Sequence, residues 1–228
     1  MKGLPVALAA TMAAAVLAYA ADGPKNGLDT LAGSVETSRE RHAAELENVK
    51  DERARFVLRL AQMREIDVLV RQAFFTLPTE PSARAPAAKK LDRIISATDA
   101  AHTAKLKALL ERHGWPRLDV FPPQSDENAW LIVQHADLDL PFQKRVLALL
   151  EPMTKNGGTD PGRYAYLYDR VATNENRPQR YGTQGDCVSL GHWAPGLRET
   201  PEKTDALRRA IGLEPLADYV RANGSGCP

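Results

Sequence analysis

The chain has 228 residues, of which 43% are apolar, 26% charged and 6% aromatic. This is the composition of an ordinary globular protein, and it excludes collagen-like, low-complexity and disulfide-dense classes. Lys and Arg number 30 against 29 Asp and Glu, so no surplus of positive charge favours nucleic acid or an anionic membrane surface. We therefore expect no nucleic-acid partner.

The first residues resemble an export signal. Lys2 precedes an uncharged, Ala-rich stretch from Gly3 to Ala21. A positive residue, an apolar run and small residues at its end are the pattern of a secretory signal peptide. We predict that residues 1–20 are removed by cleavage after Ala20, which leaves no stable membrane anchor and places the protein in the periplasm or outside the cell. The alternative is an uncleaved anchor, since the stretch is just long enough to span a bilayer.

Export gives the two cysteines, Cys187 and Cys227, a simple interpretation. In an oxidising compartment an even pair favours a disulfide. Closing this loop would stabilise the fold by about 4 kcal/mol in the chain-entropy model. The alternative is that Cys187 is a nucleophile, but His192 is the only later histidine and follows it by only five residues.

The rest of the chain is predicted to be a single, mainly α-helical domain. Gly and small polar residues at 21–33 indicate a linker, and we expect one bundle-like domain over 34–228. An apolar stripe without Pro predicts one long helix, or two in line, from Ser34 to Phe75. Further helices are expected at about 88–113, 125–135, 141–153, 161–174, 200–212 and 215–222. Two β-prone pieces, 179–183 and 188–193, predict a small hairpin near the C-terminus.

The familiar catalytic motifs G-x-S-x-G, G-x-x-x-x-G-K, H-E-x-x-H and paired C-x-x-C are absent from the sequence. The notable polar segment is Gln134 to Asp139, which follows an apolar helix. His135 and Asp139 share one side whether the backbone is helical or extended. This suits a general base with an orienting carboxylate, or a metal site of His135, Asp137 and Asp139. The alternative is that the two aspartates cap the next helix and His135 bonds a carbonyl.

A second group of polar side chains lies between residues 168 and 184. Its guanidinium groups suit carboxylate or phosphate, and its glycines let the backbone approach a ligand. The alternative is a solvated loop in which Arg170 pairs with neighbouring carboxylates. The residues concerned are Tyr168, Asp169, Arg170, Arg177, Arg180, Tyr181, Thr183 and Gln184.

Four ordered blocks resemble a bacterial family known only as a domain of unknown function. They are Gly114-Trp115-Pro116, residues 129–139 with Phe142-Gln143, residues 166–170 and residues 177–184. The resemblance covers roughly residues 55–220 and implies a mostly helical domain without a known reaction. It also implies that the polar residues at 134, 135, 137, 181, 183 and 184 are shared, which favours a common pocket.

The same resemblance extends to three further positions. Met63 and Asp67 have counterparts in similar sequences. Asp99 also has a counterpart. In the similar sequences Asn stands three residues after that counterpart, where this chain has His102. Asp67 also precedes Arg71 by four residues, so the two side chains can meet on one side of a helix.

Our functional hypothesis is that the two polar segments meet in one cleft, backed by Asp67 and Asp99. In the enzyme version His135 is the general base or a metal ligand and Asp139 orients it. Arg170 or Arg180 holds an anionic group, and Tyr181 and Gln184 are neutral donors. The remaining ligand-binding candidates are Gln134, Asp137, Tyr168, Asp169 and Thr183.

The residue types favour a hydrolase that acts on a small anionic or cell-envelope substrate. They identify no cofactor. Two alternatives stay open: a non-catalytic module that binds a ligand or a protein, as an inhibitor or immunity protein does, and a buried polar network that fixes helix packing.

Overall fold

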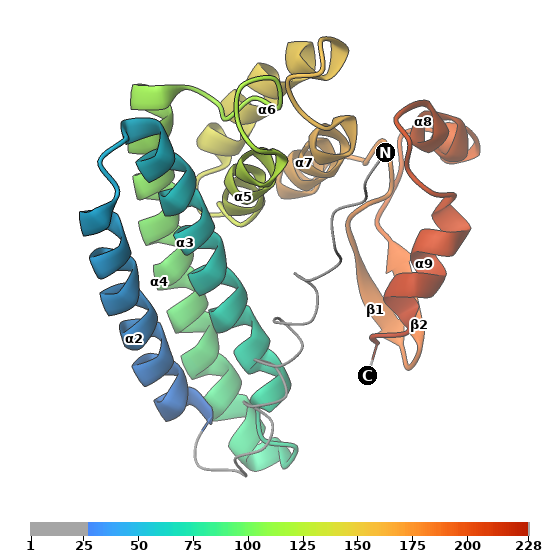
Figure 1. Cartoon of the computed structure of the whole chain (residues 1–228). Helices are drawn as coiled ribbons and strands as arrows, with labels where there is room; N and C mark the ends of the chain where they lie inside the picture. The colour runs from blue at the N-terminus through green and yellow to red at the C-terminus, as the bar shows by residue number, and fades with distance from the viewer. Residues whose placement is uncertain (1–26, 228) are drawn as a thin grey trace, which may run out of the picture.

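The computed structural model describes residues 27–227. The predicted signal peptide at residues 1–20 and the start of the predicted linker lie outside these residues. Within them the fold is mainly α-helical with one small hairpin near the C-terminus, as the sequence predicts (Figure 1). None of the described helices has a stretch long and apolar enough to cross a membrane.

Three long helices form the first part of the domain: α2 (Gly27–Asn48), α3 (Glu52–Gln72) and α4 (Pro81–His113). They pack side by side, and α3 contacts both α2 and α4 (Figure 1). The predicted linker is wrong for residues 27–33, which belong to α2. The reason is that Leu28 and Leu31 are apolar and are buried in one core cluster with Ile66 and Val70 of α3.

Helices α2 and α3 are not in line, which corrects the second prediction for this region. The chain reverses between Asn48 and Glu52, and α3 packs back along α2 (Figure 1). Asp51 begins α3 because its carboxylate accepts the backbone N–H of Ala54 at 2.7 Å. After α3, a 3₁₀ turn, η1 (Ala73–Thr76), leads toward α4.

Three shorter helices form the second part: α5 (Pro123–Gln134), α6 (Leu140–Lys155) and α7 (Pro161–Asn174). Asp139 caps α6 by accepting the N–H of Phe142 at 3.0 Å, and Asp160 caps α7 in the same way through Gly162. Helix α5 packs against α3 and α4 and also against α7. It is therefore the element through which the two parts meet.

The main core lies between these helices. Its members are apolar side chains that are almost fully buried, and they come from all of α3 to α7. Among the largest are Phe56, Leu60, Met63, Leu106, Ile132, Leu150 and Leu167. The core fixes α5 against α3 and α4, and so determines where the end of α5 lies.

The C-terminal part consists of β1 (Gly185–Ser189), β2 (His192–Pro195), η2 (Pro201–Lys203), α8 (Thr204–Ala210) and α9 (Leu216–Gly224). The strands are antiparallel, with Cys187 opposite Trp193, and α9 packs on β2. The hairpin is confirmed, but its strands differ from the predicted ones: residues 179–183 form a loop, and the turn falls inside 188–193. The predicted disulfide between Cys187 and Cys227 is present, with 5.4 Å between the Cα atoms.

Candidate functional site

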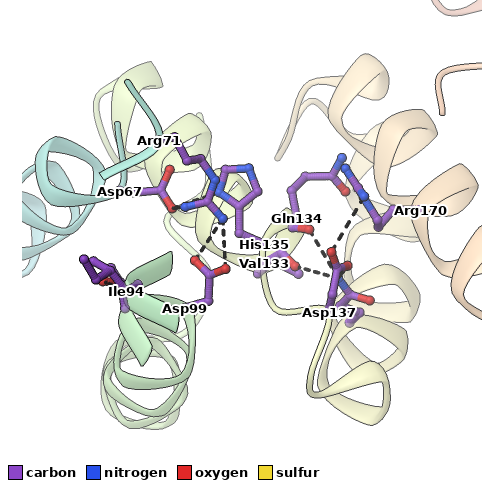
Figure 2. Close-up of polar contacts among 11 residues, drawn as sticks. Asp67, Arg71, Ile94, Asp99, Val133, Gln134, His135, Asp137 and Arg170 are labelled. Carbon is purple, nitrogen blue, oxygen red and sulfur yellow. Dashed lines mark hydrogen bonds and ion pairs between the residues drawn. The ribbon is translucent and has the colours of Figure 1, made fainter. Parts of the chain in front are cut away.

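Four ionisable side chains from three helices form one hydrogen-bonded group, which we name the Asp67 cluster: Asp67 and Arg71 of α3, Asp99 of α4 and His135 at the end of α5 (Figure 2). Arg71 donates to Oδ1 of Asp67 at 2.6 Å and to both carboxylate oxygens of Asp99 at 2.9 Å. Nδ1 of His135 lies 2.9 Å from the same Oδ1 of Asp67. One buried carboxylate thus holds both a guanidinium and an imidazole.

Local structure explains why these side chains meet. Asp67 and Arg71 are four residues apart on α3, so they share one face of the helix. His135 is the C-cap residue of α5, where the helix ends and the side chain is free to turn toward α3. Packing of α5 on α3 and α4 then brings the imidazole to the carboxylate.

The hydrogen-bond partner of His135 determines where its ring proton lies. The Asp67 side chain is only 1% exposed and is paired with Arg71. An ionised carboxylate only accepts hydrogen bonds, so Nδ1 of His135 must carry a hydrogen and donate it. No group among residues 27–227 pairs with Nε2, and Nε2 is not enclosed by the protein. In the neutral ring Nε2 is therefore a free base.

A pocket of about 190 Å³ lies beside this imidazole, between α4 and the turn from α5 to α6. Asp99 and His135 contribute to its wall, so part of the Asp67 cluster can be reached from solvent. The pocket is lined by Asp99, Ala100, Thr103, Ala104, Lys107, His135, Ala136, Leu138 and Asp139. Its lining residues carry hydroxyl, ammonium, carboxylate and imidazole groups, which can bind a polar ligand and transfer protons.

Burial shifts the pKa of Asp99, a member of the cluster, and that of the nearby His102. Burial raises the pKa of Asp99 above its ordinary value, although the hydrogen bond from Arg71 opposes this. Burial also lowers the pKa of His102 to about 4, while the charge of Asp67 acts in the opposite direction. His102 is therefore a neutral ring at physiological pH.

The structure corrects two predictions about Asp139. Its carboxylate does not orient His135, because it accepts from Lys107 at 2.8 Å and caps α6; Asp67 orients the ring instead. The predicted metal triad of His135, Asp137 and Asp139 is likewise not formed. The group whose ligand atoms lie within 4.8 Å of one another is Asp67, Asp99 and His135.

This group has the donor types that suit a divalent metal ion. Arg71, however, already bonds both of its carboxylates and supplies a positive charge there. The guanidinium thus offsets one of the two carboxylate charges and bonds three of their four oxygens. We build no metal into its chemistry.

Asp137 of the 134–139 segment faces α7 rather than α3. Gln143 donates to the carbonyl of Val133 and to Asp137, each at 3.1 Å. Asn174 also donates to Asp137, and Arg170 pairs with it at 3.7 Å. Figure 2 shows Gln134, Asp137 and Arg170 on one side of the turn and His135 pointing to the other. These contacts fix the turn that carries His135.

The predicted ligand-binding residues after Tyr168 form a network around Asp169. This carboxylate is fully buried and accepts the backbone N–H groups of Arg180, Tyr181 and Thr183 at 2.8 to 3.2 Å. Burial raises its pKa, and these hydrogen bonds oppose the rise. Asp169 therefore holds the loop on α7, and this explains why residues 179–183 do not form a strand.

Other side chains of that loop also bond within it. The guanidinium of Arg180 donates to the Tyr168 hydroxyl at 2.8 Å, and Tyr168 donates to Glu199. The backbone N–H of Gln184 donates to the Gln179 side chain, and the Gln184 side chain donates to Thr183. These groups are occupied by partners within the protein.

The two polar segments meet only in part. Asp137 pairs with Arg170 at 3.7 Å and accepts from Asn174 at 2.9 Å. Among residues 27–227, however, no hydrogen bond or ion pair joins His135 to the 168–184 segment, and the pocket contains no residue of that segment. The physical reason is that His135 at the end of α5 faces α3 and α4, whereas Asp169 holds the loop on α7 (Figure 2). The prediction that Arg170, Tyr181 and Gln184 share one cleft with His135 is therefore wrong.

The sequence reasoning missed Thr103 and Lys107. Both follow Asp99 at helical spacing, four and eight residues later, so they share its face of α4. That spacing was a usable signal. The partnership of His135 with Asp67 had no local signal, because 68 residues separate them.

Comparison with family models identifies the protein family of this chain. The model described as "Family of unknown function (DUF6624)" matches residues 56–225. The chain belongs to this family. The DUF6624 region includes the Asp67 cluster, the pocket and the loop held by Asp169, and it leaves α2 outside. The expected domain of unknown function is thereby confirmed. Neither the curated proteins nor the solved structures gave a match.

The lowered pKa of His102 predicts an acid-dependent loss of stability. Between pH 6.5 and about 4 the unfolded chain binds a proton at this ring and the folded chain does not, so stability falls as the pH falls. The slope from this group is at most about 1.4 kcal/mol per pH unit. Urea unfolding of His102→Asn should show a shallower loss over this range, and His192→Asn, an exposed control, should match the native protein. An unchanged slope in His102→Asn would contradict the assignment.

Proposed function

We propose that this protein is a hydrolase in which His135 acts as the general base. The observation that supports this most directly is the hydrogen bond from Nδ1 of His135 to the buried Asp67, with Nε2 unpaired beside the pocket. A carboxylate that fixes the ring and leaves the other nitrogen free is the arrangement by which histidine bases are oriented. Asp67 thus takes the orienting role that the sequence suggested for Asp139.

The proposed chemistry uses a water molecule in the pocket. Nε2 of His135 takes a proton from this water as its oxygen attacks the carbonyl carbon of the substrate. The carbon–oxygen or carbon–nitrogen bond to the leaving group then breaks, and the leaving group receives that proton from the imidazolium. The negative charge of Asp67 stabilises the imidazolium between these steps.

Lys107 is the group best placed to stabilise charge on the substrate. Its ammonium lines the pocket and bonds Asp139 at 2.8 Å, which holds it there. A fixed positive group near the carbonyl oxygen lowers the barrier as that oxygen becomes negative. Arg170 and Arg180, the anion-binding candidates from the sequence, contribute instead to the contacts around Asp137 and Tyr168.

We also propose that the protein acts outside the cytoplasm, on a small or cell-envelope substrate. Two observations support export: the apolar run from Gly3 to Ala21 after Lys2, and the disulfide between Cys187 and Cys227. A pocket of about 190 Å³ limits the part of a substrate that can reach His135 to a small group.

The catalytic proposal predicts a large loss of rate from two substitutions. His135→Ala and Asp67→Asn should each lower kcat/KM for p-nitrophenyl acetate by roughly 10²- to 10⁴-fold, because the base or its orientation is lost. The controls are His192→Ala and Asp92→Asn, which change the same residue types at exposed positions. Circular dichroism melting identifies a variant that fails to fold.

Activity that survives in a folded His135→Ala protein would overturn the proposal. Absence of turnover in the native protein toward ester, amide and phosphodiester substrates would leave the pocket as a binding site without catalysis.

The export proposal predicts a defined mature N-terminus. The full chain with a C-terminal tag, expressed in a Gram-negative host, should be recovered from the periplasm with Ala21 as its first residue. Mass spectrometry of a non-reduced digest should show the Cys187 and Cys227 peptides linked. Full-length, reduced protein confined to the cytoplasm would contradict export.

A further inference from the structure

A second hollow lies next to the pocket beside His135, farther along α4. Its volume is about 220 Å³, and Lys107 lines both hollows, which we together call the groove. The α4 residues of the two hollows recur every three or four positions, so they form a single stripe on the helix. From Asp99 to Glu111 this stripe extends about 18 Å. Its members are Asp99, Ala100, Thr103, Ala104, Lys107, Leu110 and Glu111.

The opposite wall comes from the α5–α6 turn and from α6. Leu138 and Asp139 line the first hollow, and Phe142, Val146 and Leu149 line the second. The last three follow one another at intervals of four and three residues, so they share one face of α6. The two hollows therefore adjoin at Lys107, whose ammonium reaches from α4 to Asp139 on the opposite wall.

The character of this groove changes along its length. At one end lie Asp99 and His135, whereas the far end is formed by Leu110, Val146 and Leu149. Leu138 is 76% exposed and Leu149 is 41% exposed. Single exposed leucines are ordinary on a protein surface, but these two flank a groove that begins at the candidate base. An apolar occupant would remove them from water.

The charged groups of the groove include no surplus of positive charge. Asp139 is paired with Lys107, and Asp99 shares Arg71 with Asp67. The second hollow adds one acid, Glu111, and one further base, Arg145, whose guanidinium lies 5.9 Å from the Phe142 ring centroid. The groove therefore has no positive field that would select an anion. The apolar wall of the second hollow, formed by Leu110, Phe142, Val146 and Leu149, fits an uncharged chain.

We propose that the groove holds the acyl chain of an uncharged ester or amide, with the carbonyl carbon beside His135 and the chain along Leu110, Val146 and Leu149. This proposal rests on the proposed hydrolase function and names its substrate class. It replaces the small anionic substrate suggested by the sequence with a neutral acyl compound, of the kind a lipid-modified envelope component contains. Hydrolysis adds water across the acyl bond and releases a carboxylic acid with an alcohol or amine.

Chain length provides the first test. For p-nitrophenyl acetate, butyrate and octanoate, kcat/KM should rise by at least about tenfold from the shortest to the longest, because added methylenes leave water. Leu149→Glu should remove most of this rise, measured as the ratio of kcat/KM for octanoate to that for acetate. Leu197→Glu, at another exposed leucine, should keep the rise. Equal chain-length dependence in the Leu149→Glu and native proteins would overturn the groove.

Binding of 1-octanol to the His135→Ala protein tests the groove without catalysis. Saturable shifts of the Leu110, Val146 and Leu149 methyl NMR signals, lost in a His135→Ala, Leu149→Glu double variant, would support it.

Octanol binding without ester turnover by the native protein would overturn the hydrolase and keep the apolar groove. Acetate turnover with no chain-length effect and no octanol binding would overturn the groove alone. A native dimer that Leu149→Glu converts to a monomer would identify a second copy as the occupant and overturn the acyl site.

Discussion

The carboxylate of Asp67 is almost fully buried, and its charge is compensated by Arg71 and His135. Arg71 also holds Asp99, so this arrangement connects α3 to α4 and to the end of α5. Removing one partner of such a group leaves an uncompensated charge, which costs about 3–5 kcal/mol in measured cases. The geometry of His135 therefore depends on the pairing of the buried Asp67 carboxylate with Arg71.

A buried ion network often serves structure alone, and two other carboxylates of this chain illustrate that case. The Asp169 carboxylate accepts hydrogen bonds from backbone and hydroxyl donors of the 180–183 loop, and Asp126 accepts from Trp115 and Thr159. Their partners are satisfied within the protein, and neither lines the pocket. The Asp67 cluster differs because it has an unpaired ring nitrogen beside a solvent-reachable pocket. That difference separates the candidate site from the structural polar networks.

Local sequence signals predicted much of the fold. The cap at Asp139, the hairpin and the disulfide follow from short-range chemistry: helix capping, glycine turns and an even pair of cysteines. The reversal before α3 was missed because it contains neither Gly nor Pro, and only Asp51 marks it. The strand positions were missed because Asp169, on another element, takes the backbone donors of the first predicted strand.

The site was only partly predictable, because its contacts also join elements that lie far apart in the sequence. His135 stood out in the sequence, and Asp67 and Asp99 were expected behind it. Their assignment as direct partners required the packing of α5 on α3 and α4, which no local pattern specifies. Spacing placed Asp139 on the same side as His135, but an ammonium group from α4 and the start of α6 engage that carboxylate. Tertiary contacts thus decided which of two plausible aspartates orients the ring.

The position of the ring proton of His135 tests this account most directly. Nitrogen–proton correlation NMR on histidine-labelled protein, at a pH where the ring is neutral, distinguishes the two tautomers. The hydrogen bond to Asp67 predicts a protonated Nδ1 and an unprotonated Nε2. A neutral ring with its proton on Nε2 would mean that Asp67 does not orient the imidazole and that the proposed base has no free lone pair in the pocket.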